Sequence, residues 1–267
     1  MQNNYSFSKA LNHENVNMLK DMWLASLPRP QDGMWESFRN DAIHFEIRDS
    51  SNVIGYACIG DNNVSLQFYI IPEYRKQGVE LFRQFIQELD IKNGIVGTNN
   101  PVYLSLALHT GRKPDIHTYL FEPGFETTVN DKKGDFKMCT PEDIERIVVH
   151  GHKSVGASKE WLTGYFGDLI EKGEVFVLEK KGEIIGTCEV RKSATAPAYA
   201  DIGMIVAPEF RKQGYGTLLL NKAKTIAIEW SKIPICSCEK DNTGSLKSIQ
   251  NCGFVSNYQL LAIDFNY

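Results

Sequence analysis

The residues best suited to chemistry lie in the segment Arg211-Lys-Gln-Gly-Tyr-Gly216. It follows an apolar stretch typical of a strand, residues 200–206, and precedes a stretch with apolar residues at helical spacing. The first N–H groups of a helix have no acceptor inside it and the helix dipole is positive there, so such a place binds phosphate groups. The two glycines remove side chains that would block a ligand, and the Arg and Lys add positive charge. The segment 211–217 is therefore predicted to bind an anion.

Spacing excludes several other sites. The Gly-x-Gly of this segment lacks the third glycine of the dinucleotide loop GxGxxG, and the Walker pattern GxxxxGK[ST] occurs nowhere. His150-Gly-His152 and Cys236-Ser-Cys238 each lack two further ligands at zinc spacing. We therefore expect no metal.

The segment is part of an internal repeat. Residues 71–78 (IPEYRKQG) return 136 positions later as residues 207–214 (APEFRKQG), with six of eight residues identical. Each copy follows a Val/Ile-Ile-Gly sequence and precedes a Gly-Phe pair. The chain therefore consists of two related halves. The polar stretch 127–134 is the expected seam, which predicts domains at residues 1–130 and 131–267.

In the second half, the apolar spacing predicts an alternation of helices and strands around the repeated loop. The predicted elements are helices over 141–154 and 158–172, a hairpin of 174–179 with 183–190, a strand over 200–206, a helix with Leu219, Ala223, Ile226 and Trp230 on one face, a strand over 234–238, a helix over 245–251 and a strand over 260–265. This order indicates an α+β fold.

With these features in place, the segment 201–254 resembles the core of the Gcn5-related N-acetyltransferases (GNATs). In that family the loop (Q/R)-x-x-G-x-(G/A) holds the pyrophosphate of acetyl-CoA, and Arg211, Gly214 and Gly216 fill its fixed positions. The lead-in Val-Ala-Pro-Glu-Phe is also similar. A second family signature, an Asn, a small-residue helix and a Gly-Phe pair, is matched by Asn242, Ser245 and Gly253-Phe254.

The resemblance implies two tandem acetyltransferase-like domains of the α+β class, each a mixed, mostly antiparallel sheet flanked by helices, with splayed central strands. It implies that the pantetheine arm of acetyl-CoA, the co-substrate, lies between strands 203–206 and 234–238. A backbone N–H near Ile205 or Val206 would polarise the thioester carbonyl. The residues expected to contact CoA are Met204, Ile205, Val206, Arg211, Lys212, Gln213, Gly214, Tyr215, Gly216, Thr217, Asn242 and Ser245. Asn242 and Ser245 also suit a helix cap, and the two roles are compatible.

The attacking amine must lose a proton, and a carboxylate near the splay is the natural base. Glu239, which ends the second splayed strand, is the first choice, and Asp201 and Glu189 are the other candidates; a solvated strand-end carboxylate is the alternative reading of each. Many family members protonate the leaving thiolate with a tyrosine where this chain has Ile249. Tyr258 or Tyr215 is a candidate to replace it. A thiol of pKa about 8.5 also leaves without this help.

The first copy of the loop continues Gly78-Val-Glu80, so a glutamate replaces the second glycine. Its carboxylate would face a pyrophosphate, and like charges about 4 Å apart cost about 4 kcal/mol at an effective dielectric constant near 20. We therefore expect a degenerate first domain that binds no CoA through this loop.

The composition limits the remaining possibilities. The 267 residues are 42% hydrophobic and 23% charged with a net charge of −4, which is typical of a globular protein and unlike a nucleic-acid-binding one. No secretory signal and no membrane-spanning apolar run is found, and six cysteines without a CxxC pair suggest reduced thiols in a cytoplasmic protein.

These observations predict an N-acetyltransferase that acts on the amine of a small molecule or peptide. The alternatives are transfer of another acyl group, and a CoA-binding regulator without turnover, which Ile249 motivates. The acceptor and the oligomeric state stay open.

Overall fold

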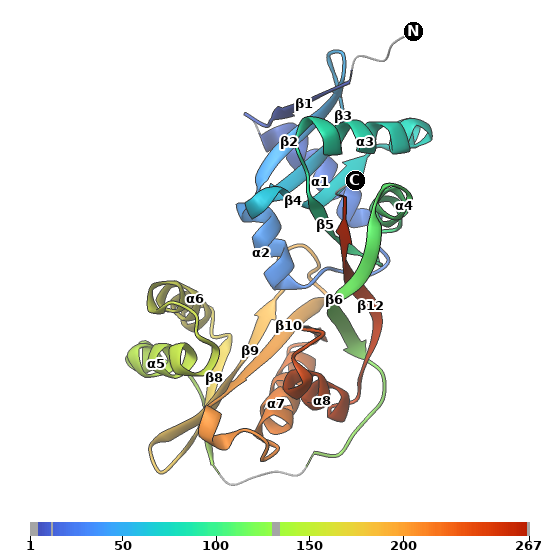
Figure 1. Ribbon diagram of the computed structural model, residues 1–267. Helices are drawn as coiled ribbons and strands as arrows, with labels where there is room; N and C mark the ends of the chain where they lie inside the picture. The colour runs from blue at the N-terminus through green and yellow to red at the C-terminus, as the bar shows by residue number, and fades with distance from the viewer. Residues whose placement is uncertain (1–4, 12, 130–133, 266–267) are drawn as a thin grey trace. The chain divides into compact units, whose positions relative to one another are not determined.

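The computed structural model of the chain describes residues 5–11, 13–129 and 134–265 (Figure 1). It has two units, Met1–Tyr119 with Tyr258–Tyr267, and Leu120–Asn257. This division differs from the expected domains 1–130 and 131–267, because the chain passes to the second unit within β6 (Arg112–Pro123) and its last strand returns to the first. Residues 130–133 of the expected seam lie outside the described residues.

The return of the last strand has a physical reason. The end of β12 (Phe254–Asp264) pairs antiparallel with β5 (Asn93–Gly97), from Leu260↔Gly97 to Asp264↔Asn93. An interior strand needs a hydrogen-bonding partner on each side. The last strand therefore covers an edge that the first unit would otherwise leave open.

The first unit has the strand order β1-β2-β3-β4-β5, followed by the end of β12. Its two helical layers bury separate apolar clusters: Val16, Leu19 and Trp23 of α1 pack on Tyr56 and Tyr69, and the larger core lies beneath α3 and α4. The elements of this unit are β1 (Tyr5–Lys9), α1 (His13–Ala25), α2 (Gly33–Asp41), β2 (Ile43–Asp49), β3 (Asn52–Gly60), a 3₁₀ turn η1 (Asp61–Asn63), β4 (Val64–Ile70), a 3₁₀ segment η2 (Pro72–Gln77), α3 (Gly78–Glu88), β5 and α4 (Pro101–Thr110).

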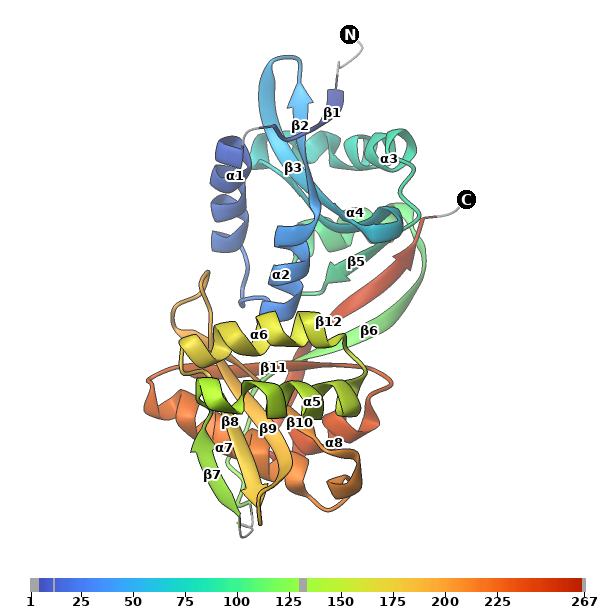
Figure 2. The same ribbon diagram turned by 90° about the vertical axis from the view of Figure 1, so that its left-hand side faces the viewer.

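The second unit has the strand order β6-β11-β10-β9-β8-β7. Helices α5 and α6 cover one face of this sheet and α7 and α8 the other (Figure 2). The elements are β7 (Asp135–Met138), η3 (Pro141–Asp143), α5 (Ile144–Val155), α6 (Lys159–Glu171), β8 (Val175–Lys180), β9 (Glu183–Lys192), β10 (Tyr199–Val206), η4 (Pro208–Phe210), α7 (Tyr215–Glu229), β11 (Ile233–Glu239) and α8 (Thr243–Asn251).

The predicted α+β fold is confirmed, and the helices and strands expected in the second half are all present. Each half has a mixed sheet that is mostly antiparallel, with one parallel pair at its centre, β4 with β5 and β10 with β11. The helices form where apolar residues recur on one face: Leu162, Phe166 and Leu169 of α6 are buried against β8, and Leu219 and Ala223 of α7 are buried on the opposite face.

Candidate functional site

The parallel strands β10 and β11 part before either ends. Their pairing runs from Tyr199↔Ile233 to Asp201↔Ile235 and then stops, whereas β10 stays paired with β9 as far as Val206↔Gly186. From Ile202 onward, the edge of β10 that faces β11 therefore has no ladder partner in the described part of the chain. This confirms the expected splay of the central strands.

The peptide groups along this edge can be oriented from their neighbours. The Ile205 carbonyl oxygen lies on the β9 side, 2.5 Å from where a Cβ of Gly186 would stand. A trans peptide directs the next N–H the opposite way, so the Val206 amide faces the gap. Ser193 N donates to the Tyr199 carbonyl (3.1 Å) and Ala207 N donates to the Ile185 carbonyl (3.0 Å), so every second residue of β10 directs its N–H and C=O toward β9. The residues between them direct theirs the other way, so the Met204 amide also faces the gap.

The loop at the end of β10 leads directly into α7. Gly214 closes it with φ 82° and ψ 4°, in the left-handed region that favours glycine. Because Gly214 is also the N-cap residue, no side chain caps the first described turn of α7. Arg211, Lys212 and Gln213 are exposed around this helix N-terminus. The arrangement therefore presents peptide N–H groups, the positive end of a 15-residue helix and two cationic side chains to solvent.

The Arg211 side chain fastens the loop to its surroundings. Its Nε donates to the Val206 carbonyl (3.2 Å) and its Nη2 to the Ser154 carbonyl at the end of α5 (2.5 Å). Gln213 Nε2 donates to the Glu209 carbonyl within the loop (3.0 Å). The loop is thus held in one shape by its own side chains.

Gly216 also has a packing role within the second unit. A Cβ there would lie 2.8 Å from the Ser248 hydroxyl of α8, so the glycine lets the first turn of α7 approach α8 closely. Tyr215 is buried with its ring edge-on to Phe210. Asn242 Oδ1 accepts a hydrogen bond from Ser245 N (3.1 Å) and caps α8.

An acidic group lies beside the gap, on the face covered by α6. In the β9–β10 register, Arg191 stands opposite Asp201 and Glu189 opposite Gly203. Arg191 Nη2 forms an ion pair with Asp201 Oδ2 at 3.1 Å, and its Nε lies 3.9 Å from Glu189 Oε1. The Asp201 side chain is 4% exposed and the Glu189 side chain 12%. The group carries two carboxylates against one guanidinium, so it favours a cation.

Tyr165 of α6 adds a hydroxyl to this group. Burial raises the pKa of Tyr165, and the charge of Glu189 raises it further, so the phenol stays protonated. Glu189 also acts on this hydroxyl as a side-chain hydrogen-bond partner. The hydroxyl therefore belongs to the acidic group beside the gap.

The structure brings together Asp201 and Glu189 of the three candidate bases. Glu239 is exposed at the end of β11, outside this group, and Ile249 is buried. Sequence reasoning missed Tyr165 and Arg191. The period-two alternation could have found Arg191, because residues 189 and 191 must share the face of residues 201 and 203.

The first copy of the loop has another shape. Here the 3₁₀ segment η2 runs directly into α3, and Gly78 is right-handed with φ −54°. Its N–H donates to the Arg75 carbonyl, and a Cβ on it would lie 3.1 Å from both Ile70 Cδ1 and Leu106 Cδ2. A continuous helical segment packed on apolar side chains thus replaces the open turn.

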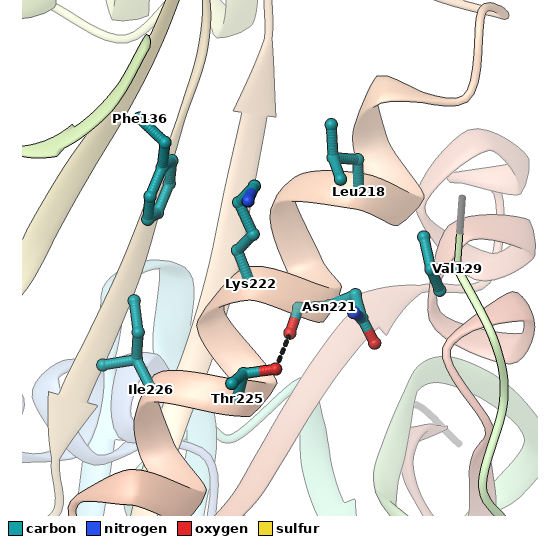
Figure 3. Close-up of a pocket in the computed structure, with 7 residues that line it drawn as sticks. All are labelled: Val129, Phe136, Leu218, Asn221, Lys222, Thr225 and Ile226. Carbon is teal, nitrogen blue, oxygen red and sulfur yellow. Dashed lines mark hydrogen bonds between the residues drawn. The ribbon is translucent and has the colours of Figure 1, made fainter. Parts of the chain in front are cut away.

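One pocket lies elsewhere, along the middle of α7 (Figure 3). Figure 3 shows Lys222 extending beside Phe136, and the ammonium nitrogen lies 5.0 Å from the ring centre. None of the loop residues lines this pocket, so it is separate from the gap. Its lining residues are Val129, Phe136, Leu218, Asn221, Lys222, Thr225 and Ile226.

Two further classes of site were sought in residues 5–11, 13–129 and 134–265. No three His, Cys, Asp or Glu side chains there are grouped so as to hold a metal ion. None of the helices in these ranges has the length and apolar character needed to cross a bilayer.

Comparison with known proteins agrees with this geometry. Residues 12–124 match the profile described as "Acetyltransferase (GNAT) domain" and residues 142–254 the profile "Acetyltransferase (GNAT) family". The chain therefore belongs to the GNAT acetyltransferases and contains two GNAT domains in tandem. No curated protein matches the chain by sequence.

Several solved structures share the whole fold. A GNAT-family acetyltransferase from Colwellia psychrerythraea is 28% identical, with a TM-score of 0.93 over 98% of this chain and 100% of that one. A GCN5-related N-acetyltransferase from Sphaerobacter thermophilus is 12% identical, with a TM-score of 0.69 over 98% and 96%. A tandem GNAT protein from the clavulanic acid biosynthesis pathway is 18% identical, with a TM-score of 0.65 over 98% and 99%.

Proposed function

We propose that this protein transfers an acetyl group from acetyl-CoA to the amine of a small molecule or peptide, and that its second unit is the catalytic one. The observation that carries the proposal is the parting of β10 from β11 beside the N-terminus of α7. The gap suits an extended chain that pairs with strand amides, and the helix end suits a diphosphate. These are the two features that a CoA ester requires together.

The residues present fit acetyl-CoA. The Met204 and Val206 amides would pair with its pantetheine arm or its acyl carbonyl. The amides from Lys212 to Thr217 would hold the pyrophosphate, and the Asn242 region would contact the arm. Bound acetyl-CoA would supply the activated acyl group and the thiolate that leaves.

Glu189 is the group we assign to accept the proton of the attacking amine. Its carboxylate lies against Gly203, and the next residue, Met204, directs its amide toward the gap. Glu239, in contrast, is exposed at a strand end. Asp201 forms an ion pair with Arg191, and its role is therefore to position that guanidinium. A protonated amine would be attracted by the excess negative charge and could hydrogen-bond to Tyr165 and Glu189. Transfer of its proton to Glu189, directly or through a water, exposes the nitrogen lone pair.

The first unit is proposed to bind no CoA through its loop. Gly78 packs against core side chains and its N–H is used within the helical segment, and Glu80 adds a negative charge to the first turn of α3. Glu80→Gly should therefore leave the CoA affinity and a stoichiometry of one CoA per chain unchanged in calorimetry. A second saturable CoA site in the unaltered protein would contradict this assignment.

Ile249 favours one alternative function. A buried isoleucine occupies the position where many family members place a proton-donating tyrosine, which suits a CoA-binding regulator without turnover. Because thiolates leave readily, we favour the enzyme. The six described cysteines are free and buried, which agrees with a cytoplasmic protein.

The experiment that tests the function follows free thiol when the full chain is incubated with acetyl-CoA and a panel of amines. Thiol release that depends on one class of amine, with the acetylated amine found by mass spectrometry, supports the proposal. Tight CoA binding without release for any acceptor would establish the regulator instead. Release with another acyl-CoA and not with acetyl-CoA would correct the donor.

A further inference from the structure

A buried cation with no carboxylate in contact lies in the first unit. Arg39 of α2 is 5% exposed, and its Nη1 donates to Gln31 Oε1, a neutral amide. The guanidinium lies 5.0 Å from the centre of the Trp23 ring. No carboxylate of the described residues forms an ion pair with it, although Asp32 and Glu36 act on it by charge from farther away, and its Nε has no hydrogen-bond partner. Burying a charge without a counter-ion in contact is costly, so an anion in contact with this guanidinium would stabilise it.

Three neutral side chains near it also carry unsatisfied groups. Gln67 Nε2, Asn99 Oδ1 and Trp23 Nε1 are buried without partners, and each residue is only 1% exposed. The other end of each amide is used inside the protein: Gln67 Oε1 accepts from Asn100 Nδ2 (3.1 Å), and Asn99 Nδ2 donates to the Arg29 carbonyl (3.3 Å). Native proteins leave few such groups, so their accumulation in one region indicates a missing ligand.

Contacts place these groups together where β4 and β5 part. The pairing of the two strands stops after Ser65↔Gly94, and Gln67 lies just beyond it on β4, opposite Cys58 of β3. Arg39 reaches the same region through Gln31, whose Oε1 accepts from Arg39 Nη1 and whose Nε2 lies beside Gly97. Two side-chain amide atoms, Asn99 Oδ1 and Gln31 Nε2, lie where a Cβ of Gly97, at the end of β5, would point.

The repeat makes this position meaningful. Gln67 is the counterpart of Gly203, 136 residues later, so these groups occupy the place that the acidic group beside the gap occupies in the second unit. The first unit has cationic and amide groups there instead of carboxylates. The equivalent place thus suits a positively charged ligand group in the second unit and a negatively charged one in the first.

We propose that the first unit binds a small carboxylate that carries a hydrogen-bond donor next to its acid group. Its carboxylate oxygens would accept from Arg39 Nε and Gln67 Nε2, and its neighbouring donor would reach Asn99 Oδ1. The ligand would place a negative charge in contact with the guanidinium, and Arg39 Nε, Gln67 Nε2 and Asn99 Oδ1 would each gain a hydrogen-bond partner. The site is separate from the proposed acetyl transfer and needs no CoA.

Isothermal titration of the full chain with glycolate tests the site, with glycolamide as the uncharged analogue and acetate as the analogue without the donor. We expect saturable binding of glycolate, at least tenfold weaker binding of acetate, and none of glycolamide. Arg39→Met should abolish glycolate binding without lowering the melting temperature of the ligand-free protein, because an apolar residue of similar size relieves the buried charge. Gln67→Leu should weaken binding at least tenfold.

Three results would overturn the site: no glycolate binding, which would mean that waters satisfy these groups; equal binding by Arg39→Met; or equal binding of glycolamide. If Arg39→Met does not fold, Arg39→Lys, which retains the charge without the Nε–H, must weaken glycolate binding at least tenfold. Lys212→Glu keeps the test independent, because it should weaken CoA binding and leave the glycolate affinity unchanged.

Discussion

Glu189 reaches from β9 to Gly203 on the neighbouring strand, and its Oε1 atom lies 2.5 Å from where a Cβ of residue 203 would stand. Any side chain at 203 would displace the carboxylate from the edge of the gap. The absence of a side chain at Gly203 therefore allows the carboxylate of Glu189, on the neighbouring strand, to reach the edge of β10 that has parted from β11.

This relationship leads to the first prediction. Glu189→Gln removes the proton acceptor with little change in shape, so kcat/KM for the amine should fall by about 10²- to 10⁴-fold while the CoA affinity is retained. Glu239→Gln is the matched control and should change kcat/KM less than about threefold. Steady-state kinetics with calorimetry measure both. A large loss in the Glu239 variant alone would restore the interpretation made from the sequence.

The repeat supplies its own control for the anion loop. Lys212 and Lys76 are equivalent and both exposed. Lys212→Glu should weaken CoA binding about tenfold, or about 1.4 kcal/mol, with a smaller effect at high salt, and Lys76→Glu should have no effect. Equal losses in the two variants would show that general charge, and not the second loop, attracts CoA.

A third prediction concerns the stability of the parted strand. A Cβ on Gly186 would lie 2.5 Å from the Ile205 carbonyl oxygen and 2.6 Å from Leu219 Cδ1, so Gly186→Ala should destabilise the protein by about 1–3 kcal/mol. Gly167, inside α6, has nothing within 4 Å of its Cβ direction, and Gly167→Ala should stabilise by about 0.5–1 kcal/mol. Urea unfolding compares the two variants, and a neutral Gly186→Ala would refute the close approach.

The fourth prediction concerns pH. Burial lowers the pKa of His150, whose Nε2 lies 3.3 Å from the Ile205 carbonyl. Between this lowered pKa and the unfolded value of about 6.5, the unfolded chain binds more protons, so stability rises with pH and is lost as the pH falls.

His150→Gln retains a hydrogen-bond donor without the titration. Unfolding free energies measured in urea at several pH values below about 7 should therefore show a smaller slope against pH than in the parent. An unchanged slope would show that other groups cause the pH dependence of stability in this range.

Patterns among neighbouring residues were sufficient to predict most helices and strands of the second half. The apolar spacing predicted α6 and α7, and the repeated Pro-Glu-aromatic-Arg segment located the loop, because these features depend on neighbouring residues. The parting of β10 from β11 came from the family resemblance, and the pairing confirms it.

The remaining features depend on residues far apart in the sequence. The partner of β5 lies more than 160 positions away in β12, so no local signal indicates that the division of the chain is discontinuous. The proximity of Tyr165 to Glu189 joins a helix to a strand of another segment. The close approach of Gly216 to Ser248 of α8 likewise depends on how two separate helices pack.

The strand that completes the first unit follows the whole second unit in the sequence. A ribosome therefore releases every residue of the second unit before the sheet of the first can close, although the first was translated earlier. The first half therefore cannot complete its sheet until the second half has been translated, and removal of residues 258–265 would leave the amino-terminal half, and not the other, incomplete.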